Sequence, residues 1–127
     1  MAEAVGHAVL ACDGVARDPS GKITLYGLFD RISAPKFPAV HPLFSIYWRC
    51  FVPGPGRAGV TIVKPDGSVL TQLEPTESGN EKPHALQGTY TIGGLEFPAE
   101  GDYLLVLNFN DKELLKSFIV LTSRPTP

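Results

Sequence analysis

The chain has 127 residues, a length typical of one domain, and hydrophobic residues make up 43% of it. This fraction excludes an intrinsically disordered chain, because enough apolar surface is present to form a core. The 13 glycines and 12 prolines indicate many turns and few long helices, since both residues interrupt regular structure. The net charge of −2 gives no positive field to attract a polyanion, so we expect no nucleic-acid partner.

The sequence carries no sign of export or of membrane insertion. Residues 1–7 lack the basic region and the long apolar stretch of a signal peptide. The longest apolar runs, at 104–107 and 118–121, are far shorter than the roughly 18 residues that a membrane span requires. We therefore expect a bacterial cytoplasmic protein that does not contact a membrane.

Eight segments alternate apolar and polar residues in the way that β-strands do. In chain order they are residues 5–12, 22–29, 43–52, 57–64, 68–74, 84–92, 102–109 and 113–121. The turns at 18–21 and 64–67 each have proline in second place and glycine in fourth, which favours a type I turn and predicts two hairpins. No segment has the periodicity of a helix.

The third segment has the clearest alternation, and it bears on the two cysteines. Phe44, Ile46 and Trp48 share one face, and Cys50 falls on the same face. In a reducing compartment, Cys12 and Cys50 are expected to be buried free thiols and not a disulfide or a reactive nucleophile.

Eight short strands close either as a sandwich or as a barrel. The Gly-Asp-Tyr sequence at 101–103 resembles the tyrosine corner of immunoglobulin-like sandwiches, with Trp48 on the expected strand C. Leu105 stands in place of the usual second cysteine, so the disulfide of that fold is absent. We predict an all-β fold, a single immunoglobulin-like antiparallel β-sandwich of seven to eight strands spanning residues 1–127, with an ordered core at 5–121. A small barrel or jelly roll is the alternative.

Several segments together resemble a family of small bacterial proteins. They are residues 11–14, 21–32, 37–42, 65–67 and 101–103. The family is known only as a domain of unknown function. The resemblance implies a compact β-sandwich and no assigned activity.

The sequence lacks a convincing catalytic or cofactor motif. Residues 54–59 fit the spacing G-x-G-x-x-G, but a strand and not a helix follows, and Pro55 removes one N–H donor, so we expect no nucleotide there. His7, His41 and His84 are not spaced as metal ligands. The sequence therefore favours a protein that is not an enzyme, with no catalytic residue, cofactor or metal.

The connection at 30–42 is the candidate partner-binding loop. The candidate residues are Asp30, Arg31, Phe37, Val40 and His41. Three prolines stiffen this loop, and a stiff loop that exposes an aromatic side chain loses little entropy on binding. The alternative is that Phe37 and Val40 fold back and cover the open end of the sandwich.

Two further segments bear on binding. The polar connection at 75–83 is predicted to be a mobile, tolerated insertion. The strand at 5–12 has few charges to protect an edge, which suggests self-association, and a charge introduced at Val9 is then expected to give a monomer.

These observations favour a non-catalytic protein-interaction or scaffold module of the bacterial cytosol. Its partner is either an unidentified protein or a second copy of the chain bound through an edge strand. The alternative is a small-molecule or metal-binding protein, or an enzyme, in which Asp13, Asp30 and His41 converge at the 30–42 end of the sandwich.

Overall fold

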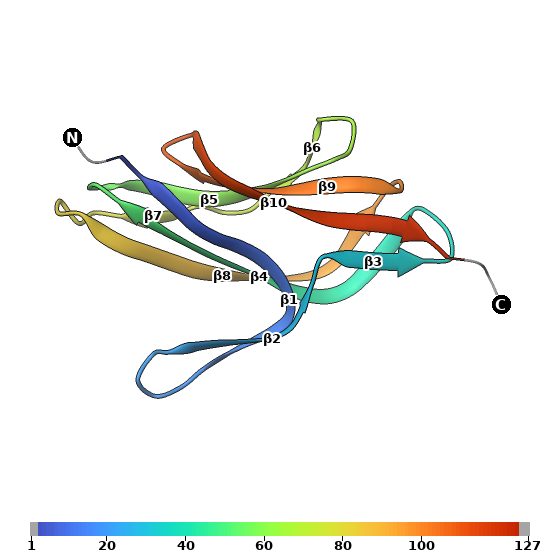
Figure 1. Ribbon diagram of the computed structural model, residues 1–127, viewed down its shortest axis with the longest axis horizontal. Coiled ribbons are helices and arrows are strands. Elements are labelled where there is room, and N and C mark those ends of the chain that lie inside the picture. The colour runs from blue at the N-terminus through green and yellow to red at the C-terminus, as the bar shows by residue number, and fades with distance from the viewer. Residues whose placement is uncertain (1–2, 125–127) are drawn as a thin grey trace.

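The computed structural model describes residues 3–124, which fold into two β-sheets packed face to face (Figure 1). The strands within these residues are β1 (Val5–Arg17), β2 (Ile23–Phe29), β3 (Arg31–Ala34), β4 (Ala39–Val52), β5 (Gly56–Val63), β6 (Val69–Gln72), β7 (Thr76–Ser78), β8 (His84–Phe97), β9 (Gly101–Phe109) and β10 (Lys112–Ser123). The first sheet has the order β2-β1-β4-β8, and the second has the order β3-β10-β9-β5-β6, with β7 beside β5. Residues 1–2 and 125–127 of the predicted span lie outside the described residues. Residues 3–124 contain no helix able to cross a membrane.

The predicted all-β sandwich is confirmed, and it has two strands more than the eight expected segments. The additions are β3, with four residues, and β7, with three. The sandwich is antiparallel as predicted, except that the added strand β3 runs parallel to β10, with Arg31 opposite Val120. No hairpin turn precedes β3, because the chain crosses from one sheet to the other at Asp30, whose carbonyl accepts a hydrogen bond from the Val120 N–H (2.8 Å).

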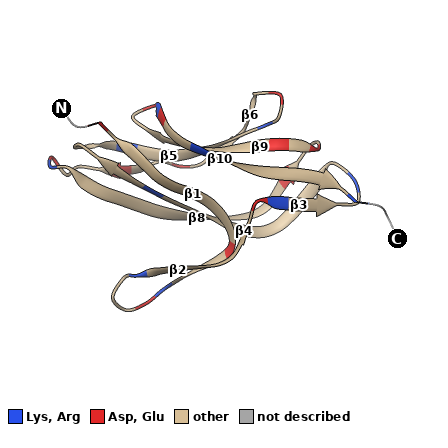
Figure 2. Cartoon of the chain, viewed as in Figure 1, with Lys and Arg blue, Asp and Glu red and all other residues tan. Residues whose placement is uncertain are grey.

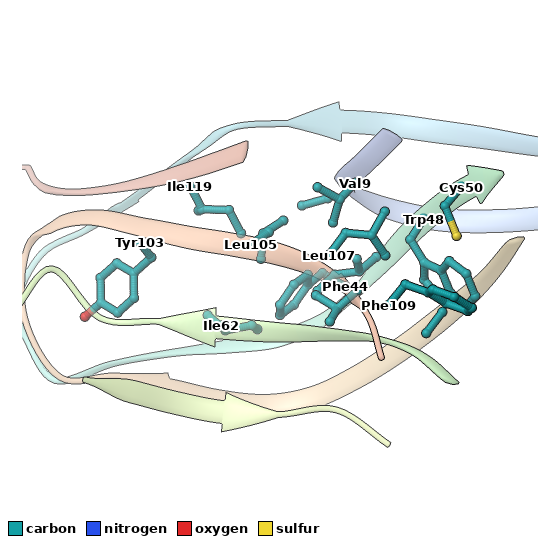
Figure 3. Close-up of a cluster of buried hydrophobic side chains, with 14 of the residues drawn as sticks. Val9, Phe44, Trp48, Cys50, Ile62, Tyr103, Leu105, Leu107, Phe109 and Ile119 are labelled. Atoms are coloured by element: carbon teal, nitrogen blue, oxygen red, sulfur yellow. The ribbon is translucent and has the colours of Figure 1, made fainter. Parts of the chain in front are cut away.

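The core lies between the sheets and follows the alternation expected of β4. Phe44, Ile46, Trp48 and Cys50 all have no exposed surface, as predicted. Figure 3 shows Phe44, Trp48 and Cys50 in one cluster with side chains of the opposite sheet, Leu105 among them. Burial of each large apolar side chain contributes roughly 1.5–3 kcal/mol to folding, so this layer is the main stabilising element of the fold.

The predicted tyrosine corner is present at the start of β9. The Tyr103 hydroxyl donates to the Ala99 carbonyl oxygen (2.7 Å) and accepts from the Ala99 N–H (3.2 Å). The Tyr103 ring also packs edge-on against Phe97, with 5.1 Å between ring centroids. The hydroxyl therefore fixes the corner that connects β8 to β9.

Both predicted hairpin turns are present. The Gly21 N–H donates to the Asp18 carbonyl oxygen (3.0 Å), and the Gly67 N–H donates to the Lys64 carbonyl oxygen (2.9 Å). The two glycines have φ angles of 88° and 91°, which residues other than glycine rarely adopt. The turns thus connect β1 to β2 and β5 to β6, and those strands pair antiparallel.

The interpretation of residues 5–12 as an unprotected edge is wrong. β1 pairs with β4 along this stretch and with β2 from Ala11 onward. The Ser117 hydroxyl of β10 donates to the Val9 carbonyl oxygen (2.6 Å), so β10 covers part of the side that β2 leaves open. Because Val9 is only 1% exposed, a charge there would disrupt the core and would not test self-association.

The connection at 75–83 is more ordered than predicted. Its residues 76–78 form β7, which pairs with the start of β5. The His84 ring closes the segment, because its Nε2 lies 2.7 Å from the Ser78 hydroxyl oxygen and its Nδ1 lies 2.7 Å from the Lys82 carbonyl oxygen. These contacts hold the connection against the sandwich.

Candidate functional site

The free edge of β2 is the starting point for a binding site. Within residues 3–124, β2 is the outermost strand of its sheet and has β1 as its one partner. Together the two strands form a hairpin that projects from the body of the sandwich (Figure 1). Because β2 is an edge strand, the N–H and C=O groups along its outer side are available to pair with another chain.

The turn that carries this hairpin is well fixed. The Asp18 carboxylate accepts hydrogen bonds from the Ser20 hydroxyl (2.6 Å), the Ser20 N–H (2.9 Å) and the Lys22 N–H (2.9 Å). These donors, the Ser20 hydroxyl first among them, hold the pKa of Asp18 below its usual value. The edge is therefore presented by an organised hairpin and not by a loose loop.

β2 is also less protected than the other sheet edges. It contains no charged residue and no proline (Figure 2), although such residues commonly protect an edge from unwanted pairing. β3, β6 and β7 have only three or four residues each. β8 is long, but it carries a charge at Glu96.

Large apolar side chains are exposed next to this edge. Leu10 is 38% exposed, Leu28 is 60% exposed and Phe118 is 53% exposed; we call these three side chains the apolar patch. They border two adjoining shallow hollows of about 300 and 250 Å³. The lining residues are Leu10, Ala11, Leu28, Phe29, Asp30, Ser117, Phe118 and Val120.

The structure does not bring the five predicted loop residues into one site. Asp30 lines the hollows beside the apolar patch, and Arg31 begins β3. Val40 lies in β4 and is 61% exposed. Phe37 is half-buried against the hydrophobic core. His41 is half-buried between two aromatic rings, with its centroid 5.6 Å from that of Phe29 and 5.4 Å from that of Phe44.

The expected loop at 30–42 is also shorter than predicted. Residues 31–34 belong to β3 and residues 39–42 belong to β4, so only residues 35–38 connect the two strands. Pro42 is accommodated because the pairing of β4 with β8 passes over it, from His41 opposite Leu95 to Leu43 opposite Gly93. Proline lacks the N–H that a ladder hydrogen bond requires, but this position needs no donor.

The residues proposed for a metal site do not form one. Within residues 3–124, no three His, Cys, Asp or Glu side chains lie close enough together to hold a metal ion. The His41 ring instead packs against two aromatic rings, tilted toward Phe29 and edge-on to Phe44. Nothing in this arrangement favours the metal-binding alternative built on Asp13, Asp30 and His41.

A third hollow lies beside the first residues of β5 and β7 and measures about 360 Å³. The Arg57 guanidinium and the Glu77 carboxylate lie 3.1 Å apart at its wall, and both side chains are largely exposed. Exposed ion pairs contribute at most about 1 kcal/mol. Because Gly56–Val63 is the strand β5, the G-x-G-x-x-G spacing leads into a strand, as expected.

The two cysteines are free and buried, as predicted. Burial raises the pKa of the Cys12 thiol and of the Cys50 thiol above the usual value. The Cys12 thiol also donates to the Gly14 carbonyl oxygen (3.3 Å). A raised pKa leaves little thiolate at neutral pH, so neither residue has the character of a nucleophile.

The chain is similar to solved structures at low sequence identity. The chain resembles an alkylpurine DNA glycosylase from Pseudomonas fluorescens, solved with DNA containing an abasic site analog, with 14% identity and a TM-score of 0.53. This match covers 95% of the chain but only 31% of the glycosylase. An immunoglobulin-like protein from Pseudomonas aeruginosa matches at 13% identity and a TM-score of 0.41, over 94% of the chain and 97% of that protein.

The sequence itself points to a family and not to an activity. No curated protein matches it significantly. A model of a protein family matches residues 7–121, which is most of the chain, and that family is described as one of unknown function. The resemblance found in the sequence is therefore confirmed, and the chain, a β-sandwich, belongs to this family of unknown function, DUF6941.

Proposed function

We propose that this protein is a non-catalytic protein-interaction module of the bacterial cytosol, which binds its partner along β2 and the apolar patch. The observation that carries this proposal is the exposure of Leu10, Leu28 and Phe118 beside an uncharged free edge. Clustered apolar side chains on a surface are typical of protein-binding sites. A free edge adds backbone hydrogen bonds to such a site, as in β-strand addition.

A protein partner fits this surface better than a small molecule does. The hollows beside the apolar patch are shallow, and among residues 3–124 the one charged side chain that lines them is Asp30. A small-molecule site normally encloses most of its ligand and has several converging polar groups. An extended polypeptide, by contrast, can use both the edge and the patch.

A protein partner is also favoured over a nucleic acid. The glycosylase that shares this fold was solved with DNA, but the likeness at 14% identity is one of fold. The net charge of −2 and the scattered positions of Lys and Arg (Figure 2) give no basic stripe of the kind that binds phosphate backbones.

Of the predicted loop residues, we assign Asp30 to the binding surface. Arg31, which follows it in the chain, is a further candidate, whereas Val40 is exposed but does not line the hollows beside the apolar patch. Phe37 and His41 contact the core and neighbouring rings, so we assign both to packing.

The proposal can be tested with the tagged protein purified gently from its own cells. Leu28→Lys places a charge in the apolar patch, and Val69→Lys is the matched control, because Val69 is exposed to a similar extent (57%) on the remote β6. Quantitative mass spectrometry is expected to show proteins that co-purify with the wild type and the control but are depleted with Leu28→Lys. Equal recovery with all three proteins would overturn the proposal.

A further inference from the structure

We infer that β2 binds β2 of a second copy of this chain, antiparallel and about a two-fold axis at Tyr26. This inference rests on the proposed function, since it names the occupant of the same edge. The joined strands would form one continuous sheet in the order β8-β4-β1-β2-β2-β1-β4-β8. Such an interface uses the same surface on both copies, as two-fold symmetry requires.

The charges that flank β2 identify the partner. Lys22 precedes the strand, Asp30 follows it, and both residues are exposed. Within residues 3–124 neither of them takes part in an ion pair, since the pair between Arg57 and Glu77 is the one found there. Each end of the edge therefore has an unpaired charge, and the two charges have opposite signs.

Antiparallel pairing of two copies matches these charges. With Tyr26 on the axis, Lys22 of each copy lies opposite Asp30 of the other copy, so two complementary contacts form. Parallel pairing in register would instead place like charges side by side, which is unfavourable for directly opposed residues. The edge is self-complementary in one direction and one register.

The uncharged residues between the two ends also suit this register. Thr24 falls opposite Leu28, so the partner strand would cover a leucine that is 60% exposed. Leu25 falls opposite Gly27, where the absence of a side chain leaves space. The Tyr26 ring, 56% exposed, lies over Gly14 of β1, so it leaves the free side of β2 clear for the partner strand.

The edge is continuous enough to pair along its length. Gly27 has a φ of 67°, but the register of β2 with β1 is the same on both sides of it, with Leu28 opposite Cys12 and Tyr26 opposite Gly14. A side chain at Gly27 would collide with Asp13, so the glycine here serves the hairpin itself.

Charge reversal tests the register directly. Lys22→Asp or Asp30→Lys alone sets like charges opposite each other at both ends of the interface, whereas the double variant restores both contacts. Sedimentation equilibrium of the purified full chain is expected to show a dimer whose dissociation constant rises about tenfold in each single variant. In the double variant the dissociation constant should return to within about twofold of the wild-type value. Lys82→Asp, a reversal of an exposed charge outside this edge, is the control and should leave the constant unchanged.

The outcomes separate this inference from the proposed function. A wild-type protein that is monomeric at about 1 mM overturns the dimer, as does a dimer that is insensitive to both single reversals. Neither result affects the co-purification experiment, in which Leu28→Lys and Val69→Lys decide whether the edge binds a different protein. Thermal melting of each variant distinguishes loss of dimer from loss of fold.

Discussion

The Tyr103 hydroxyl makes two hydrogen bonds to Ala99, four residues earlier, at 2.7 Å to its carbonyl oxygen and 3.2 Å to its nitrogen. The corner between β8 and β9 is thus closed by a side chain from the strand that follows it. Because the Tyr103 side chain is fully buried, water does not replace these bonds when they are lost.

Tyr103→Phe is therefore expected to lower the free energy of unfolding by about 1–2 kcal/mol, measured by urea denaturation. Tyr47→Phe is the matched control, because the Tyr47 hydroxyl bonds to Gln87 at the surface (2.7 Å). Tyr47→Phe should lower the free energy of unfolding by less than about 0.5 kcal/mol, since water can replace an exposed hydrogen-bond partner. An equal loss of unfolding free energy in the two variants would show that the hydrogen bonds of the corner stabilise the fold no more than a surface hydrogen bond does.

Phe37→Ala tests whether the 35–38 connection is a cover or a binding element. Phe37 packs against the core, so its truncation should destabilise the fold by about 2 kcal/mol, less than for a fully buried phenylalanine. Val40→Ala, at a side chain that is 61% exposed, should change stability by under about 0.5 kcal/mol. An unchanged melting curve for Phe37→Ala would instead show that Phe37 does not stabilise the fold and would favour a binding role for its side chain.

Acid should destabilise the protein through its two hairpin turns. Hydrogen bonds from Ser20 hold the pKa of Asp18 below 3.8, and those from Ser68 do the same for Asp66. Since the folded-state pKa is lower than the unfolded one, each carboxylate stabilises the fold above pH 3.8 and loses this contribution as the pH falls through its folded-state pKa.

The double variant Asp18→Asn, Asp66→Asn keeps turn-forming side chains but removes both titrations. Its melting temperature should fall less steeply than that of the wild type between about pH 5 and pH 2.5. Parallel melting curves for the two proteins over this range would contradict the assignment.

The thiols should be inert in the folded protein. Burial raises the pKa of Cys12 and of Cys50, and the thiolate is the species that reacts with Ellman's reagent. At pH 8 the native protein should react at least about 100-fold more slowly than the guanidinium-unfolded protein, in which both thiols are accessible. Fast reaction of one thiol in the native state would identify an exposed, activated cysteine that the structure does not contain.

The parts of the fold that were predictable depend on local chemistry. The turns ending in Gly21 and Gly67 were recognised because proline and glycine at those spacings favour one backbone geometry. The buried face of β4 followed from strict alternation through Trp48, and the corner followed from the position of Tyr103. Each of these signals lies within about ten residues of sequence.

The parts that were missed depend on partners far apart in sequence. Nothing in residues 31–34 indicates that Arg31 would pair with Val120, because a four-residue strand has too little pattern to define its neighbour. Val9 lies in a stretch that is apolar on both faces, so no alternation in this stretch predicts the hydrogen bond from Ser117 to the Val9 carbonyl oxygen. The apolar patch was missed for the same reason, since Leu10, Leu28 and Phe118 meet only in the folded chain.

The bond from Ser117 to Val9 has a consequence for how the protein is made. The ribosome delivers β1 first, whereas β10, which pairs with β9 and β3 and covers part of the side of β1, comes after every other described strand. Until residues 112–123 emerge, Ile119 and Leu121 are missing from the core and the Val9 carbonyl lacks its hydrogen bond from Ser117. The sandwich can close only after about nine-tenths of the described chain has been synthesised, so during that interval it is the growing chain, and not the finished protein, that needs protection from aggregation.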